Sequence, residues 1–244
     1  MLDGAALAVA FLTILPVRPR GNPADLRAAA AWLPLVGALA GGLAGAARYY
    51  GETLFGATVA SVVAVAVLVI VSGALHQDGL ADCADGLGAR GGRERRLAVM
   101  RDPATGVFGT LALVGWVLML TSTLAQLDRG DALRALVVAA VVSRAAALVH
   151  AVVTPPARSD GLGAAFDVTP ASLAFAAVTA ATAAILVAGP VEGLAAIAVA
   201  VLVALTVSAA ARTLLGGRTG DSLGATVALA EIAICLTLLA FATA

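Results

Sequence analysis

Residues 57–86 read ATVASVVAVAVLVIVSGALHQDGLADCADG, and this stretch contains the two features that decide the fold. Its first part, Ala57–Leu75, carries no charged side chain and is close in length to the roughly 20 residues that cross a bilayer as a helix. Its second part is polar and contains Asp78, Asp82 and Asp85. The stretch therefore predicts a transmembrane helix that delivers an acidic cluster to the membrane surface.

The composition of the whole chain is that of a membrane protein. Of its 244 residues, 61% are hydrophobic and 12% are charged, and the mean hydropathy is +1.01. A soluble domain carries about 25% charged residues. Seven apolar segments have lengths near that of a bilayer span: Ala28–Ala47, Ala57–Leu75, Val107–Leu127, Ala132–Val153, Ala171–Ala188, Leu194–Leu215 and Leu223–Ala242. We therefore predict an all-α, polytopic integral membrane helix bundle with about seven transmembrane helices.

An eighth apolar segment, Leu2–Leu15, ends at Pro16 and is short for a bilayer span. The sequence leaves open whether this segment spans, re-enters or lies in the interface. The longest polar stretch, residues 76–106, is too short and too polar to build a core of its own. We therefore expect residues 1–244 to form a single transmembrane domain.

The arginines are unevenly distributed along the chain, which contains no lysine. Loops 16–27, 76–106, 154–170 and 216–222 are rich in arginine, and they alternate with loops that have few. Because seven spans place these four loops on one face, the positive-inside rule predicts that this face is cytoplasmic. We expect a multi-pass protein of the cell inner membrane. The arginines of this face are Arg18, Arg20, Arg27, Arg90, Arg93, Arg95, Arg96, Arg101, Arg158, Arg212 and Arg218.

The net charge and the two cysteines give two further expectations. The formal net charge is +0, so the overall charge gives no indication of a nucleic-acid partner, and we expect none. Cys83 and Cys235 have no neighbouring Cys or His at metal-ligand spacing, so neither a zinc site nor a disulfide framework is expected. The oligomeric state stays open, with a homo-oligomer as one option.

Asp78, Asp82 and Asp85 follow a spacing of i, i+4 and i+7, which places all three carboxylates on one face of a helix. Hard oxygen ligands of this kind suit Mg²⁺ or Mn²⁺ better than zinc. His76, two residues before the cluster, could act as a base or as a hydrogen-bond partner. The alternative is a solvated acidic face, or aspartates that cap short helices.

Two further segments of the arginine-rich face suit phosphate binding. Arg96 and Arg101 could clamp a diphosphate, although the positive-inside rule alone also accounts for arginines in this loop. Gly217 and Arg218 belong to a glycine-rich turn that leads into a helix, where backbone N–H groups can bind an anion. Asp221, at the end of this turn, could instead cap that helix.

Ionisable and small residues inside the predicted spans indicate how helices pack. Ionisable groups in a membrane are usually paired or functional, and we expect Arg144 to pair with Glu231 and lock two helices together. Gly37, Gly41 and Gly45 form a ladder of small residues that allows close helix approach.

Ordered motifs run along nearly the whole chain. The central ones are His76-Gln77-Asp78-Gly79-Leu80-Ala81-Asp82, Asp85-Gly86, Met100-Arg101-Asp102 and Thr105-Gly106. The flanking ones are Phe11-Leu12-Thr13, Leu15-Pro16-Val17, Trp32 with Pro34-Leu35-Val36-Gly37, Val142-Ser143-Arg144, Gly161-Leu162-Gly163, and residues 215–225 with Glu231. With these motifs the chain resembles the cobalamin-5′-phosphate synthase family, also called adenosylcobinamide-GDP ribazoletransferases.

The resemblance implies a membrane transferase of cobalamin biosynthesis. Such an enzyme joins adenosylcobinamide-GDP to α-ribazole or its 5′-phosphate, releases GMP and requires Mg²⁺. By this resemblance Asp78, Asp82 and Asp85 would hold the metal. Phosphoryl transfer also needs a group that orients or deprotonates the attacking hydroxyl, and His76, Asp102 and Asp221 are unranked candidates for it.

Two other functions stay open on the sequence. Residues 85–90 match the opening of the motif of CDP-alcohol phosphatidyltransferases, but Val99, Pro103 and Val107 stand where that motif requires a glycine and two aspartates. A cation transporter could use the acidic cluster and Glu231, but transporter sites usually lie near the midplane of the membrane. Here the charged residues concentrate in surface loops, which favours an enzyme.

Overall fold

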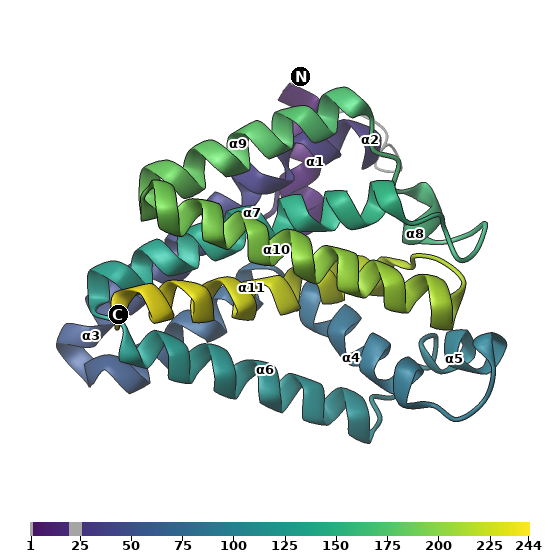
Figure 1. The fold of residues 1–244 in the computed structure, drawn as a ribbon, viewed down its shortest axis with the longest axis horizontal. Coiled ribbons are helices and arrows are strands. Elements are labelled where there is room, and N and C mark those ends of the chain that lie inside the picture. Colours follow the sequence, from purple (N-terminus) through teal and green to yellow (C-terminus); the bar gives the residue numbers. More distant parts are fainter. Residues whose placement is uncertain (1, 20–25) are drawn as a thin grey trace.

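A computed structural model describes residues 2–19 and 26–244, and Arg20 of the arginine-rich face lies outside these ranges. The predicted all-α architecture is confirmed, because long helices account for most of the described chain and run side by side (Figure 1). Six of them are long and apolar enough to cross a membrane: Leu26–Val71, Val107–Gln126, Arg129–Val153, Pro170–Ala188, Pro190–Leu215 and Gly220–Ala242. The helices are α1 (Leu2–Leu12), α2 (Leu26–Ala29), α3 (Leu33–Val71), α4 (Leu75–Gly88), α5 (Arg93–Val99), α6 (Val107–Gln126), α7 (Arg129–Val153), α8 (Leu162–Ala165), α9 (Pro170–Ala188), α10 (Pro190–Ala210) and α11 (Gly220–Ala242), with a 3₁₀ turn at Ala30–Trp32 and a π turn at Ala211–Leu215.

The longest helix, α3, reverses its direction at Gly56. This residue has φ 77° and ψ 168°, which lie outside the helical region and suit only glycine well. A Cβ built on Gly51 would lie 3.4 Å from the Cβ of Ala60, whereas residues nine apart in a straight helix are separated by about 13 Å along the axis. Hence α3 contains most of the predicted segments Ala28–Ala47 and Ala57–Leu75, folded against each other (Figure 1). Together the six long helices account for most of the seven predicted apolar segments.

The first half of α3 packs closely on α7 through the predicted glycine ladder. A Cβ on Gly37 would lie 2.3 Å from the carbonyl oxygen of Ala140, and one on Gly41 would lie 2.5 Å from that of Leu136. A Cβ on Gly45 would lie 3.0 Å from the side-chain Cγ of Leu133. The ladder is therefore a packing surface, because any side chain at Gly37 or Gly41 would collide with backbone atoms that cannot move aside.

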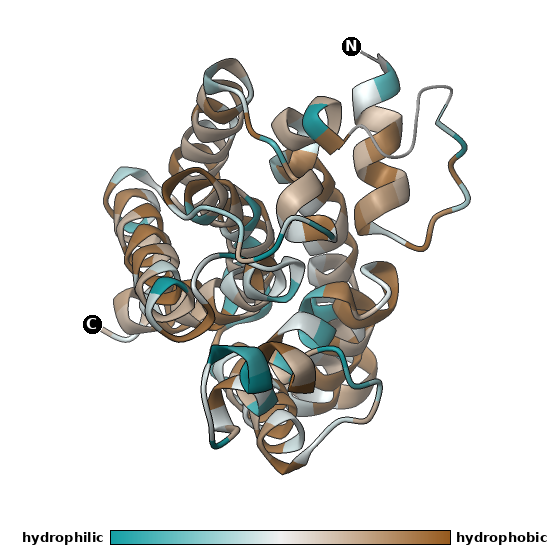
Figure 2. Cartoon of the chain, turned by 90° about the vertical axis from the view of Figure 1, so that its right-hand side faces the viewer, coloured by the Kyte–Doolittle hydropathy of each residue, from teal (hydrophilic) through white to brown (hydrophobic). Residues whose placement is uncertain are grey.

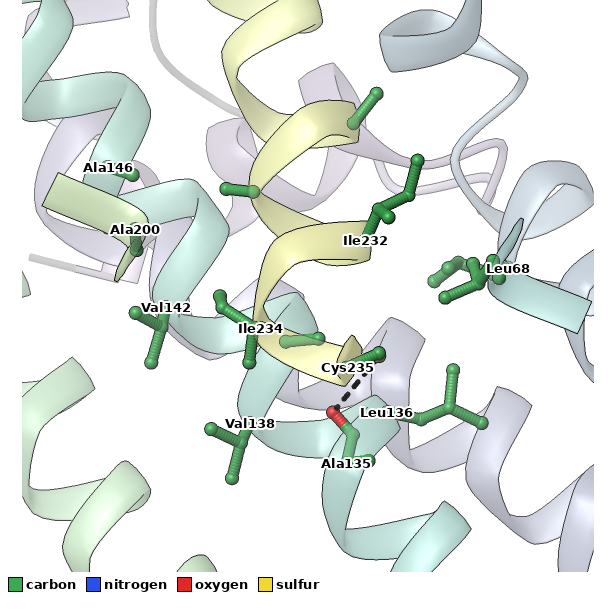
Figure 3. Close-up of a cluster of buried hydrophobic side chains, with 14 of the residues drawn as sticks. Leu68, Ala135, Leu136, Val138, Val142, Ala146, Ala200, Ile232, Ile234 and Cys235 are labelled. Atoms are coloured by element: carbon green, nitrogen blue, oxygen red, sulfur yellow. Dashed lines mark hydrogen bonds between the residues drawn. The ribbon is translucent and has the colours of Figure 1, made fainter. Parts of the chain in front are cut away.

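The centre of the bundle is α7, which is surrounded by α3, α9, α10 and α11. Figure 3 shows side chains of α7 and α11 meeting there, with the thiol of Cys235 directed at the carbonyl oxygen of Ala135, 4.0 Å away. The predicted pair is also present at this interface, since the Arg144 guanidinium donates to the Glu231 carboxylate and both side chains are buried. His150 is a satisfied core histidine, hydrogen-bonded at 2.6 Å to Ser208 and at 2.9 Å to Ser222.

The N-terminal apolar segment forms the short helix α1. Its Leu7, Ala8 and Leu12 are buried in a small cluster with α2 and the start of α3. A helix of 11 residues is about 16 Å long, roughly half the thickness of the hydrocarbon core. Helix α1 is therefore too short to cross a bilayer alone, and it covers one side of the bundle (Figure 1).

The four arginine-rich loops meet at one end of the bundle. The Arg27 guanidinium lies 3.5 Å from the Asp167 carboxylate, and that of Arg101 lies 2.9 Å from the Asp160 carboxylate. Loops 16–27 and 76–106 therefore both contact loop 154–170. Loop 154–170 pairs with loop 216–222, because the backbone N–H of Arg218 donates to the Pro155 carbonyl at 2.8 Å. Figure 2 looks onto this end, where hydrophilic residues gather on the short connecting segments.

Candidate active site

Helix α4 carries the acidic motif and begins immediately after α3. The chain turns at Ala74, which adopts a left-handed conformation with φ 57°, so α4 leaves at an angle to the preceding helix. His76 and Gln77 are buried at its first turn, whereas Asp78 is exposed and Asp82 is half-buried. The helix therefore presents its carboxylates on the side away from the core, as the predicted spacing requires.

The start of α11 lies against α4 and adds a carboxylate to this face. A Cβ on Gly79 would lie 2.6 Å from the carbonyl oxygen of Asp221, so only glycine allows this crossing. Gly224, one turn along α11, packs against Gly79 and His76. The structure thus brings Asp221 to Asp78 and Asp82, although more than 130 residues separate α4 from α11 in the sequence.

Mutual repulsion among these carboxylates is visible at Asp82. Burial, followed by the charges of Asp78, Asp221 and Asp85, raises the pKa of Asp82 from 3.8 to about 7. A divalent cation near these oxygens would relieve the repulsion, and carboxylate oxygens suit Mg²⁺. In residues 2–19 and 26–244 no group of three or more His, Cys, Asp or Glu side chains is close enough to hold a metal ion. Because Mg²⁺ typically takes one or two carboxylates and completes its shell with substrate phosphates and water, the donors present still fit Mg²⁺.

Asp85, the third predicted ligand, binds the N-terminus of α6. Its carboxylate accepts hydrogen bonds from the N–H of Gly106 at 2.7 Å and from the N–H of Gly109 at 2.9 Å. Both oxygens of Asp85 are therefore engaged in this structure, and the negative charge is well placed at the positive end of the α6 dipole. The capping alternative raised on the sequence thus describes this aspartate.

Two adjoining cavities open at the junction of α4 and α11. The first is mostly apolar and includes His76, Asp78 and Arg144 in its wall. The second is polar and includes Arg101, Arg158 and Asp160. Leu162, Gly220 and Asp221 line both cavities, so Asp221 stands at their common boundary.

His76 lines the apolar cavity with an unsatisfied ring nitrogen. The residue is 4% exposed, and its Nε2 is buried with no hydrogen-bond partner among the described residues. Burial, together with the charge of Arg144, lowers the pKa of His76 well below its ordinary value. The ring is therefore neutral at physiological pH and can donate one hydrogen bond.

The predicted phosphate-binding residues Arg101 and Arg96 differ in the contacts that they make. Arg101 pairs with Asp160 in the polar cavity, and both side chains are more than half exposed, so this contact is weak and can be exchanged for a phosphate. Arg96 donates to the carbonyls of Gly86 and Leu87 and closes the C-terminus of α4. Arg158, which the site prediction omitted, also lines the polar cavity, and its place on the arginine-rich face was the only signal available for it.

Arg218 and Gly217 hold the loop at residues 154–170 in place. The Arg218 guanidinium donates to four backbone carbonyls, those of Ala151, Thr154, Gly163 and Phe166. Burial lowers the pKa of Arg218. The N–H of Gly217 is bound to the carbonyl of Ala211. Both predicted substrate-binding residues therefore have their donors committed within the protein, and they act here as positioning residues.

Asp102, a third candidate for the proton-accepting group, lies in an exposed turn. Its carboxylate accepts a hydrogen bond from the N–H of Ala104 at 3.0 Å, two residues further along. Asp102 lines neither of the two cavities. Of the three candidates, Asp221 is the one that faces both cavities.

Comparison with known proteins gives one consistent result. The family model described as Cobalamin-5-phosphate synthase matches residues 4–239. A protein of Azorhizobium caulinodans named adenosylcobinamide-GDP ribazoletransferase is 40% identical over 258 residues, which cover 99% of this chain and 97% of the relative. Relatives with the same name from Mesorhizobium japonicum and Escherichia coli are each 36% identical, covering 97% and 84% of this chain and 92% and 85% of the relative. No solved structure matches the chain.

Proposed function

The chain belongs to the cobalamin-5-phosphate synthase family and is an enzyme of cobalamin biosynthesis, and from this premise we propose that it joins adenosylcobinamide-GDP to α-ribazole or its 5′-phosphate. A ribose hydroxyl of the acceptor attacks the phosphate that carries the cobinamide. The new bond joins the ribose oxygen to this phosphorus, the bond to the GMP oxygen breaks, and GMP leaves.

The observation that carries this proposal is the effect of the nearby Asp78 and Asp221 charges on Asp82, with Asp221 also lining a polar cavity that contains Arg101 and Arg158. Phosphoryl transfer depends on positioning and on positive charge around the transferred group. Carboxylates that favour a cation, next to arginines that can bind phosphate oxygens, supply both requirements. The family match favours this chemistry over a CDP-alcohol phosphatidyltransferase and over a cation transporter.

The metal is proposed to be Mg²⁺, held by Asp78 and Asp82 together with substrate phosphate oxygens. When bound, it supplies positive charge to the diphosphate and to the transferred phosphoryl group. Asp85 stays hydrogen-bonded to the N-terminus of α6 and so helps to position α4, which carries Asp78 and Asp82. Mn²⁺ has similar ligand preferences and is the alternative ion.

The chain's own residues bind the diphosphate and move the proton. Arg101 exchanges Asp160 for a phosphate oxygen, and Arg158 contributes a second guanidinium from the facing loop. Asp221 accepts the proton of the attacking hydroxyl, because it is the candidate base at the boundary of the two cavities. The arginine-rich end faces the cytoplasm of a cell whose inner membrane holds the protein, which gives the site access to nucleotide substrates.

The test is an assay of purified protein in lipid with adenosylcobinamide-GDP, Mg²⁺ and either α-ribazole or α-ribazole 5′-phosphate. GMP release is expected, and the better acceptor is identified by its kcat/KM. Asp82→Asn is expected to reduce kcat at least 100-fold, whereas Asp131→Asn, at the other end of the bundle, keeps full activity. No GMP release by the unaltered protein, or full activity of Asp82→Asn, would contradict the mechanism. Cation flux through protein-only liposomes without GMP release would favour the transporter.

A further inference from the structure

Most of the wall of the apolar cavity, apart from Asp78 and Asp221, takes no part in the proposed phosphate chemistry. The cavity has a volume of about 130 Å³ and opens to solvent. Aromatic and aliphatic side chains of α1, α3, α8 and α11, with one residue just after α8, form much of its wall: Phe11, Leu12, Leu33, Leu162, Phe166 and Leu223. The rings of Phe11 and Phe166 lie 6.4 Å apart between centroids. Such a wall suits a flat apolar ring.

One fully buried polar atom in this wall has no hydrogen-bond partner among the described residues. Arg144 also borders the cavity, and its Nη1 donates to Glu231, Ser143 and Ala140. The Nε2 of His76 has no such contact. A buried polar atom without a partner destabilises the protein, so its retention here favours a ligand that supplies the partner.

The position of the apolar cavity next to the polar cavity indicates which group is attached to the ring that it binds. It shares Leu162, Gly220 and Asp221 with the polar cavity, in which the diphosphate is proposed to bind. A ring in the apolar cavity would therefore place its attached sugar at Asp221. This is the arrangement that the acceptor of the proposed reaction requires, with its base on one side of the boundary and its hydroxyl directed to the other.

We infer that the apolar cavity binds the heteroaromatic base of the acceptor ribonucleoside, and that the Nε2–H of His76 donates a hydrogen bond to a ring nitrogen of that base. This inference rests on the proposed function. His76 is thus a specificity-determining residue, not the proton acceptor of the reaction. The guanine of the donor suits this cavity poorly, because several of its donors and acceptors would lose their partners against a mostly apolar wall.

The test measures equilibrium binding of the acceptor nucleoside to the purified protein in lipid, without donor and without Mg²⁺. The two probes are α-ribazole and an analogue in which CH replaces the free ring nitrogen of the base. The unaltered protein is expected to bind α-ribazole roughly tenfold more tightly than the analogue, as one hydrogen bond to a buried donor would give. His76→Leu is expected to bind both probes equally.

Gln77→Leu is the matched control, because Gln77 is the adjacent buried polar residue of α4 and does not line the cavity. It should keep the tenfold preference. A second variant, Ala147→Leu, places a larger side chain in the wall and should weaken binding of both probes at least tenfold while binding of GMP stays unchanged. Unchanged GMP binding also reports that this variant is folded.

The inference is overturned if His76→Leu keeps the preference for α-ribazole, or if Ala147→Leu binds both probes as well as the unaltered protein does. GMP release from the full substrate pair is measured separately on the unaltered protein. Normal GMP release with either of those binding results would mean that this inference fails while the proposed function stands. No GMP release would instead count against the proposed function itself.

Discussion

At the scale of single residues, the three candidates for the proton acceptor differ in what surrounds them. Asp221 borders both cavities, His76 faces only the apolar one, and Asp102 is bound within its own turn. Asp221→Asn should reduce kcat by roughly 10²- to 10⁴-fold, the contribution of a general base, with little change in KM. Asp102→Asn should change kcat less than threefold. Steady-state kinetics of the two variants checks the ranking, and equal losses would contradict it.

Asp82 connects the site to the pH dependence of stability. Its pKa is raised from 3.8 to about 7 in the folded chain, so folding favours its protonated form. The contribution of Asp82 to stability is therefore fully present below about pH 4, and it is lost progressively until the pH passes about 7. Asp82→Asn removes this dependence, because an amide does not titrate.

The measurement is the difference in Tm between the unaltered protein and Asp82→Asn, followed from pH 4.5 to pH 8.5 in EDTA. This difference should fall with rising pH and level off above about pH 7. Effects of His76 cancel, because both proteins contain it. At pH 8, Mg²⁺ should raise the Tm of the unaltered protein and leave that of Asp82→Asn nearly unchanged. A difference that rises with pH would show that the Asp82 carboxylate is stabilised by the fold, contrary to its surroundings.

At the scale of helices, the contact between α3 and α7 depends on glycine at defined positions. A Cβ on Gly41 would lie 2.5 Å from the backbone of α7, whereas one on the adjacent Gly42 would meet nothing within 4 Å. Gly41→Leu must push the two helices apart, at a cost of about 1–3 kcal/mol or more. Gly42→Leu makes the same chemical change on an open surface and should change stability by less than about 0.5 kcal/mol. Thermal unfolding in a mild detergent compares the two, and a similar loss for both would show that the glycines serve helix flexibility instead of packing.

The apolar segments were predictable because their cause is local. Each transmembrane span needs about 20 consecutive apolar residues, and such a run can be recognised from those residues alone. The reversal of α3 at Gly56 was partly predictable, since two apolar segments preceded residue 76 and a turn had to join them. The tight turn at Gly56 was not predictable, because one glycine with positive φ is hard to recognise in a glycine-rich chain.

The site was predictable only where its residues share one helix. The spacing of Asp78 and Asp82 placed them together, and their approach to Asp221 depends on how α4 crosses α11 at Gly79. Asp85 and Arg218 do not take their predicted ligand-binding roles, and the reason is the same for both. Asp85 meets the start of α6, and Arg218 meets the carbonyls of a loop more than 50 residues away, which are tertiary contacts without a sequence pattern.

At the scale of the whole molecule, the charges of the two ends differ strongly. Arg48, Arg129 and Arg134 are the arginines at the end opposite the site, where Arg48 binds the carbonyls of Leu124 and Leu127 and Arg129 lies over Tyr49. The other end carries the arginine-rich loops and the two cavities. Because insertion keeps arginine-rich loops in the cytoplasm, this asymmetry predicts the orientation of the site as well as its composition.

The orientation can be measured with single added cysteines. Gly92 lies in the exposed turn before α5 at the arginine-rich end, and Val191 is 62% exposed at the start of α10 at the other end. The native Cys83 and Cys235 are buried, and burial raises the pKa of Cys83, so both thiols should react slowly. A membrane-impermeant maleimide should label Val191→Cys in cells whose inner membrane is intact. It should label Gly92→Cys only after that membrane is opened. The reverse pattern would place the site outside the cytoplasm, where nucleoside diphosphate substrates are scarce, and would contradict the proposed access of the donor.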